Sequence, residues 1–161
     1  YDKDPASIGM IIFPGAILSA VAQFIGRLID TFGNLPLIFF GHAALIISTV
    51  ILTFFSGFSP YAILIAYMFM STGFSSLTSS IANEASRILP EKEIGAGMGM
   101  TQLVQFFGGA FGVALSGLFI EWQQGLAPKI IYANIFAGLA GLIVCSLIVF
   151  IWYFRGRKKL E

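Results

Sequence analysis

The 161-residue sequence is poor in the side chains on which enzymes and soluble domains depend. Only 11% of its residues are charged, against about 25% in a typical soluble domain, and it has one histidine and one cysteine. A single cysteine excludes an internal disulfide framework and a cysteine metal cluster. Because no Walker loop and no catalytic or metal-ligating group is recognisable, we predict that the protein is not an enzyme and needs no cofactor or metal. A net charge of +1 gives no electrostatic basis for binding nucleic acid.

Apolar residues dominate what is present. They make up 57% of the chain, and the mean hydropathy is +0.89. Five apolar segments each approach the roughly 20 residues that a helix needs to cross a hydrocarbon core. We therefore predict an all-α, polytopic membrane protein that forms a single bundle of five transmembrane helices. The predicted spans run roughly from Ile8 to Ile25, Pro36 to Phe55, Pro60 to Ile81, Ile94 to Ile120 and Ile130 to Phe154.

Proline residues mark the starts of these spans, where a missing amide hydrogen has the smallest effect on helix stability. Such prolines are Pro5, Pro36, Pro60 and Pro128. Only Pro14 falls inside a span, where it removes one helical hydrogen bond and is expected to kink the helix. The kink is either a hinge or a static bend that improves packing.

The basic residues predict how the bundle lies in the membrane. Seven of them fall on the side of the bundle that carries the end of the first, third and fifth spans: Arg27, Arg87, Lys92, Arg155, Arg157, Lys158 and Lys159. Only Lys3 and Lys129 fall on the other side. The positive-inside rule then places the amino terminus outside and the carboxyl terminus in the cytoplasm of a multi-pass plasma membrane protein.

Small and amide side chains share one face of the fourth span. Gly95, Gly99, Gln102, Gln105, Gly109, Gly112 and Ser116 follow one another at steps of three or four residues, which is the helical repeat. Small residues let helices approach closely in lipid, so the glycines and Ser116 indicate helix packing. An amide at membrane depth needs a partner or a water-filled cavity. Gln102 and Gln105 therefore either line a pathway or bond to a neighbouring helix.

The loop after the first span reads Gly26-Arg-Leu-Ile-Asp-Thr-Phe-Gly-Asn-Leu-Pro. It resembles the second, degenerate copy of the glycine–aspartate loop motif that major facilitator transporters carry between paired helices on the cytoplasmic side. Its glycine, acid and second glycine match Gly26, Asp30 and Gly33, and Arg27 is the nearest cation in sequence. Asn34 and Leu35 stand where the motif has basic residues, so a gating charge network is expected to be weaker here. The motif implies a structural or gating role for Asp30, the alternative being a solvated loop acid.

The fourth span extends the resemblance. Glu93-Ile-Gly-Ala-Gly-Met-Gly-Met, followed by Gly108-Gly-Ala-Phe-Gly112, is similar to the penultimate helix of the drug:proton antiporters with fourteen helices, which include multidrug and tetracycline exporters. This resemblance implies the carboxy-terminal part of a bacterial proton-coupled exporter of drugs or amphipathic cations, with the five helices forming most of one half of the fold. The implied partners are the missing amino-terminal helices, the lipid bilayer, the drug and protons. Because the chain begins with Tyr1 rather than Met, we expect a fragment.

Further polar and aromatic residues are candidates for the substrate pathway. Gln23 joins Gln102 and Gln105 as a possible polar contact, and Phe74 and Phe106 offer the apolar surface that drug pockets use. In the third span, Ser71, Ser75, Thr78, Ser79 and Ala82 recur at helical spacing and are expected to serve packing. His42 either titrates near neutral pH or is held by hydrogen bonds.

A different class of function is also compatible with the sequence. A free-standing small membrane protein would assemble as a homo-oligomer through the face from Gly95 to Gly117 and act as a channel or an assembly module. The absence of an acidic residue near the predicted midplane, together with the missing initiator methionine, favours the transporter fragment. Substrate and coupling ion are not specified by any motif.

Overall fold

The computed structural model describes residues 4–22 and 33–157, and every regular element among them is helical. The helices are α1 (Pro5–Ala22), α3 (Asn34–Phe55), α4 (Pro60–Ile88), the short 3₁₀ helix η1 (Glu91–Glu93), α5 (Ile94–Trp122) and α6 (Pro128–Arg157). The predicted all-α class is therefore confirmed. Helix α4 continues past Ile81, where the third span was expected to end, as far as Ile88.

Four of the described helices are long and apolar enough to cross a membrane, judged by length and composition. They correspond to the second to fifth predicted spans. The first predicted span coincides with α1, which has 18 described residues and contains the shorter apolar stretch Pro5–Leu18. These findings support a polytopic membrane protein, whereas the orientation of its termini stays a prediction.

The helix starts follow local sequence signals. Pro5, Pro60 and Pro128 are the first residues of their helices. Pro36, also expected to mark a start, is the third residue of α3, which begins at Asn34. Before α1, the Ser7 hydroxyl donates to Asp4 Oδ1 at 2.5 Å, and this bond holds the pKa of the Asp4 carboxyl below its usual value. Before α4, the Ser59 side chain accepts a hydrogen bond from the Tyr61 amide.

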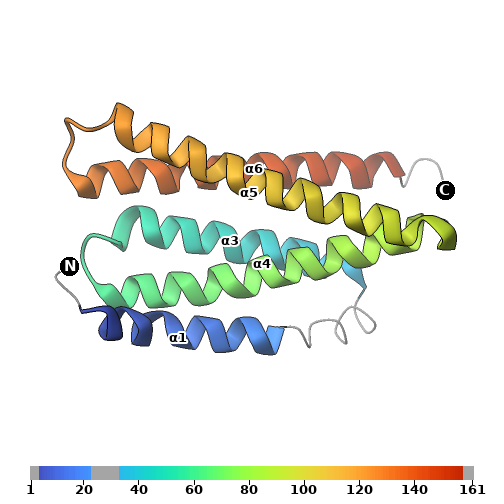
Figure 1. The fold of residues 1–161 in the computed structure, drawn as a ribbon, viewed down its shortest axis with the longest axis horizontal. Helices are drawn as coiled ribbons and strands as arrows, with labels where there is room; N and C mark the ends of the chain where they lie inside the picture. The colour runs from blue at the N-terminus through green and yellow to red at the C-terminus, as the bar shows by residue number, and fades with distance from the viewer. Residues whose placement is uncertain (1–3, 23–32, 158–161) are drawn as a thin grey trace.

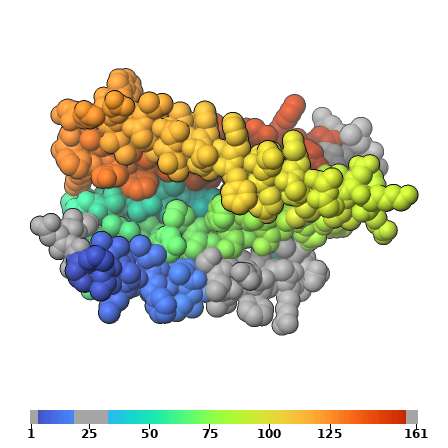
Figure 2. Space-filling model, viewed as in Figure 1, coloured from blue at the N-terminus to red at the C-terminus, as the bar shows by residue number. Residues whose placement is uncertain are grey.

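The helices lie side by side in layers, with α3 and α4 in the middle (Figure 1). Helix α4 packs between α1 and α3, α6 packs on α3, and α5 makes smaller contacts with α4 and α6. Within the described chain α5 has no buried residue and forms a long exposed ridge, yellow to orange in Figure 2. Few of the apolar side chains that the structure describes are buried: Leu37, Ile38, Ala44, Leu52, Ala66 and Ile131.

Small residues bring α3 and α4 together. A Cβ atom added to Gly73 would lie 2.8 Å from the Gly41 carbonyl oxygen, so the two backbones meet at this pair. On either side of it, Ser48 Oγ donates to the Ala66 carbonyl at 2.7 Å and Ser76 Oγ donates to the Leu37 carbonyl at 2.9 Å. Each bond satisfies a hydroxyl that lipid cannot satisfy.

Helix α4 contacts α3 through small residues that are not among those expected from the sequence to serve packing. Gly73, Ser76 and Ser80 are buried, and the first two contact α3 directly. The expected packing face is only half-buried except at Ser71, its members being Ser75, Thr78, Ser79 and Ala82. Ser71 is buried, and Thr78 accepts a hydrogen bond from Gln105 of α5. The packing role expected of the other members stays a prediction, because spacing alone does not show which residues meet a neighbour.

Candidate functional site

The predicted pathway amides lie on α5, where this helix crosses α4. Gln105 Nε2 donates to Thr78 Oγ1 of α4 at 3.4 Å, a long and therefore weak hydrogen bond, and the side chain is half-buried. Thr78 in turn donates to the Phe74 carbonyl at 2.8 Å. Gln102 is exposed. Of the two alternatives for these amides, the helix-to-helix bond is thus present at Gln105.

The aromatic pathway candidates flank this crossing and leave much of their surface open. Phe74 on α4 is 55% exposed and Phe106 on α5 is 76% exposed. Neither ring is enclosed by the described part of the chain. Their contact with a substrate remains a prediction. Gln23, the remaining candidate, lies outside the described residues.

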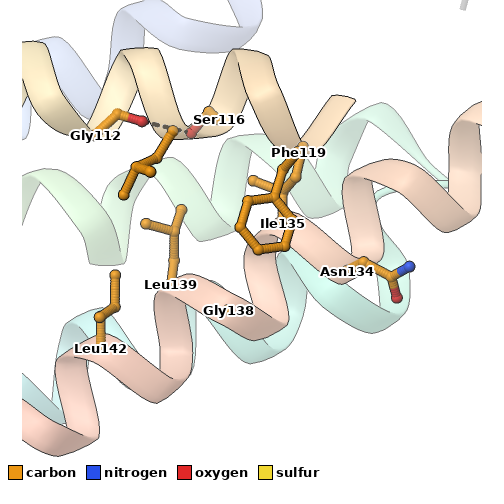
Figure 3. A pocket seen from close by; sticks show the side chains of 9 residues that line it. Gly112, Ser116, Phe119, Asn134, Ile135, Gly138, Leu139 and Leu142 are labelled. Atoms are coloured by element: carbon orange, nitrogen blue, oxygen red, sulfur yellow. Dashed lines mark hydrogen bonds between the residues drawn. The ribbon is translucent and has the colours of Figure 1, made fainter. Parts of the chain in front are cut away.

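A pocket of about 300 Å³ separates α5 from α6 (Figure 3). Phe119 from α5 and Ile135 and Leu139 from α6 point into the space between the helices, and Gly112 and Ser116 form part of its wall. The Ser116 hydroxyl forms a hydrogen bond within its own helix, because it donates to the Gly112 carbonyl at 2.8 Å. The pocket therefore offers an apolar surface with few polar groups available to a ligand.

Four glycines on one face of α5 were expected to serve close packing, and the described chain leaves all four open. A Cβ atom added to Gly95, Gly99, Gly109 or Gly112 would meet no described atom within 4 Å beyond its own helix. Any close partner of this face must come from outside the described residues. The packing role of these glycines and of Ser116 therefore stays a prediction.

The loop motif is described only at its last glycine. Gly26, Arg27 and Asp30 lie outside the described residues. Gly33 directly precedes α3 and has φ of 80°, a left-handed backbone conformation that glycine adopts without strain. The gating role expected of the motif is therefore a prediction.

Directly after this glycine, a polar cluster that the sequence did not reveal joins α3 to α4. We call Asn34, Asn83 and Glu84 the amide clamp. Asn34 Nδ2 donates to Glu84 Oε2 at 2.8 Å, and Asn83 Nδ2 donates to Asn34 Oδ1 at 3.0 Å. Asn34 is only 6% exposed. In the sequence Asn34 stands out only as a departure from the motif, and its partners lie 49 and 50 residues further along the chain, too far for a local pattern to indicate them.

His42 forms a second polar link, between α3 and α6. It is 4% exposed, its Nδ1 lies 2.8 Å from the Ile38 carbonyl oxygen and its Nε2 lies 3.3 Å from Ser146 Oγ. Because a carbonyl only accepts, Nδ1 carries a proton in this arrangement. The ring also stacks on Phe150 at 6.2 Å between centroids. The structure confirms the hydrogen-bonded alternative for this residue.

Among residues 4–22 and 33–157, no group of three or more His, Cys, Asp or Glu side chains is placed to hold a metal ion. Several described polar side chains instead link helices, as Ser48, Ser76 and His42 do, while other hydroxyls bond to carbonyl groups of their own helix. A bundle of apolar helices joined by such contacts defines a polytopic helical membrane protein.

Comparison with known proteins identifies the family. The whole chain, residues 1–161, matches the family described as the Major Facilitator Superfamily, and the chain belongs to that superfamily. The superfamily inferred from the loop motif is thereby confirmed. The superfamily is a class of membrane transporters.

Two similar proteins are the lincomycin resistance proteins LmrB of Listeria innocua and Listeria monocytogenes. Each is 26% identical to this chain over 153 residues, which is 89% of the chain and 32% of the relative. The chain thus spans about a third of the length of these curated relatives. No solved structure gives a significant match.

Proposed function

We propose that this chain is the carboxy-terminal, five-helix part of a bacterial exporter that couples the efflux of drugs or amphipathic cations to proton entry. The observation that carries the proposal is the match of the entire chain to the Major Facilitator Superfamily, combined with similarity to two proteins named for lincomycin resistance. In transporters built from repeats, substrate binds between the halves and rocking of one half against the other gives alternating access.

The length of the aligned region supports the branch with fourteen helices. Five helices out of fourteen would be about a third of such a protein, close to the 32% of each relative that is aligned. The uncovered face of α5 fits the same proposal, because a half transporter must present surfaces to the other half. The missing amino-terminal helices are therefore the partner we propose for this chain.

We propose that substrate passes the α4–α5 crossing. Gln105 is suited to this role because its long bond to Thr78 can be exchanged for a bond to a ligand with little loss. Gln102 is exposed, and the open rings of Phe74 and Phe106 add apolar surface for a flat aromatic cation. The carboxylates needed for proton coupling would lie in the helices that precede this chain.

Ethidium efflux from cells that express the full-length gene tests the proposal. Host cells lacking their own drug exporters should lose preloaded ethidium faster with the gene than with an empty vector. A protonophore should abolish this difference, and lincomycin should be tested as a competitor because of the names of the relatives. Equal ethidium loss with gene and empty vector would refute the proposed export, and efflux that survives the protonophore would refute proton coupling.

The size of the protein in its source membranes distinguishes this proposal from the alternative, a homo-oligomeric channel or assembly module. An antibody against residues 155–159 should detect a band of about three times 17.4 kDa in source membranes, as expected when fourteen spans replace five. A band at 17.4 kDa itself would favour the free-standing protein. Ion leakage through the purified short chain, independent of any proton gradient, would then be the expected activity.

A further inference from the structure

The amide clamp lies where α3 begins and α4 ends, next to the loop that carries the glycine–aspartate motif. Asn34 is the first residue of α3, and the left-handed Gly33 directly precedes it. The Asn34 side chain uses its amide nitrogen on Glu84 and its oxygen on Asn83, so both partners belong to α4. One buried side chain thus fixes the position of the loop exit relative to the end of α4.

The pairing of α3 with α4 runs continuously up to the clamp. Ser76 bonds to the Leu37 carbonyl, and one further turn along α4 brings Ser80 opposite the start of α3. Ser80 is completely buried, yet its hydroxyl has no hydrogen-bond partner among the described residues. A buried hydroxyl without a hydrogen-bond partner is unfavourable, so Ser80 does not itself stabilise the contact between α3 and α4. Neighbouring residues must hold the two helices together at this point.

The clamp supplies the closing contacts at this end of the interface. Farther along, the helices are joined by the Gly41–Gly73 approach and by serine-to-carbonyl bonds. Beyond Ser80 the bonds to Asn34 replace them. A hydrogen bond to a carboxyl group in a partly buried site is stronger than a bond between neutral groups, and a neutral amide donor does not itself have to be desolvated as a charge.

We propose that Asn34 is a positioning residue for transport, and that the amide clamp makes the start of α3, which follows the motif in sequence, and the last turns of α4 move as one body during alternating access. This inference rests on the transport function proposed above. Where the motif of the superfamily has a basic residue, this chain uses an amide that reaches the carboxyl group of Glu84. The clamp keeps the start of α3 in a fixed position relative to α4 while the two halves of the transporter rock.

A donor–acceptor exchange tests the bond itself. Asn34→Asp removes the donor and places two carboxyl groups at the 2.8 Å contact, which they cannot share when both are ionised. Adding Glu84→Gln restores one amide donor and one carboxylate with their roles reversed, and Asn83 can still donate to the new carboxylate. In the full-length exporter, Asn34→Asp should lower kcat for ethidium about tenfold with little change in KM, and the double variant should recover most of it.

A cysteine at the unpartnered position reports the clamp without any substrate. In a cysteine-free background, which includes Cys145→Ser, Ser80→Cys should be protected from a membrane-permeant maleimide. Asn34→Asp should raise its labelling rate at least fivefold, and the double variant should restore protection. Ser48→Cys is the matched control, because Ser48 is equally buried in the same interface. Its partner Ala66 lies about 21 Å along α4 from Ser80, so its labelling should not change.

The two measurements separate the possible failures. If the unsubstituted protein does not export ethidium, the proposed function fails and the labelling alone decides whether the clamp exists. A labelling rate of the Ser80→Cys variant that Asn34→Asp leaves unchanged would overturn the clamp. Labelling that rises and recovers while kcat stays constant would overturn the positioning role. A fall in kcat that the double variant does not rescue would show that the donor–acceptor bond is not what Asn34 contributes.

Discussion

The meeting of Gly41 with Gly73 gives the most direct prediction about stability. In Gly73→Ala the new Cβ atom would lie 2.8 Å from the Gly41 carbonyl oxygen and 3.1 Å from Ala44 Cβ. Side-chain carbons do not approach backbone oxygen so closely in folded proteins, and this oxygen cannot rotate away because it belongs to the helix. Helices α3 and α4 must therefore separate by several tenths of an ångström.

The expected loss of stability follows from three contributions. Overpacking of a tight contact destabilises by about 1 to 3 kcal/mol. Separation also weakens the two bonds made by Ser48 and Ser76, and hydrogen bonds between membrane helices contribute about 0.6 kcal/mol each. The higher helix propensity of alanine offsets about 1 kcal/mol of this loss. Gly73→Ala should thus lower the free energy of unfolding by about 2 kcal/mol.

Unfolding of the full-length protein by dodecyl sulfate in mixed micelles measures this quantity through the loss of helical circular dichroism. Gly141→Ala in α6 is the matched control, because a Cβ atom there would meet no described atom within 4 Å beyond its own helix. The control should be neutral or slightly stabilising. If Gly73→Ala changes the unfolding free energy by no more than the control does, within about 0.5 kcal/mol, the α3–α4 contact is not as close as described.

Three further substitutions probe other contacts. Gly15→Ala would drive a Cβ atom into the Tyr67 ring between α1 and α4, so it should destabilise by about 1 to 3 kcal/mol in the same assay, and Tyr67→Ala should relieve part of that loss. His42→Ala removes a buried ring, its bond to Ile38 within α3 and its bond to Ser146 of α6. It should lower the free energy of unfolding by about 2 to 4 kcal/mol, and an unchanged unfolding midpoint would contradict the link to α6. Gln105→Leu should slow ethidium export more than Gln102→Leu does. If both variants export ethidium as fast as the unsubstituted protein, neither amide contacts the substrate and both serve helix packing.

Local signals in the sequence were sufficient for the class of protein and for the helix starts. Hydrophobic runs of about 20 residues have few alternatives to membrane helices. Pro5, Pro60 and Pro128 each begin a helix, and Pro36 lies in the first turn of α3, where the missing amide hydrogen of a proline has no helical partner in any case. The Ser59 cap is equally local.

Contacts between helices were not predictable in the same way. The His42–Ser146 link joins residues 104 positions apart, and the Asn34–Glu84 bond joins residues 50 apart. Which residues meet depends on the rotation and register of two packed helices, and these follow from the sum of many small packing terms. Glycine on α5 and glycine on α3 look alike in sequence, yet within the described chain only Gly41 and Gly73 bring two glycine backbones together.

The glycines of α1, α3 and α4 are tightly packed, whereas those on one face of α5 are open, so the two groups of helices differ in what they contribute to the bundle. Helices α1, α3 and α4 are joined by tight approaches at Gly15 and Gly41, and by buried hydroxyl bonds. Helix α5 has the greater glycine content but no buried residue within the described chain. Glycine in an exposed helix lowers stability by about 1 kcal/mol relative to alanine, so a glycine-rich face with nothing against it is unfavourable unless another surface covers it. Helices α1, α3 and α4 therefore form a tightly packed unit. We propose that α5 is the helix that packs against the remaining helices of the transporter.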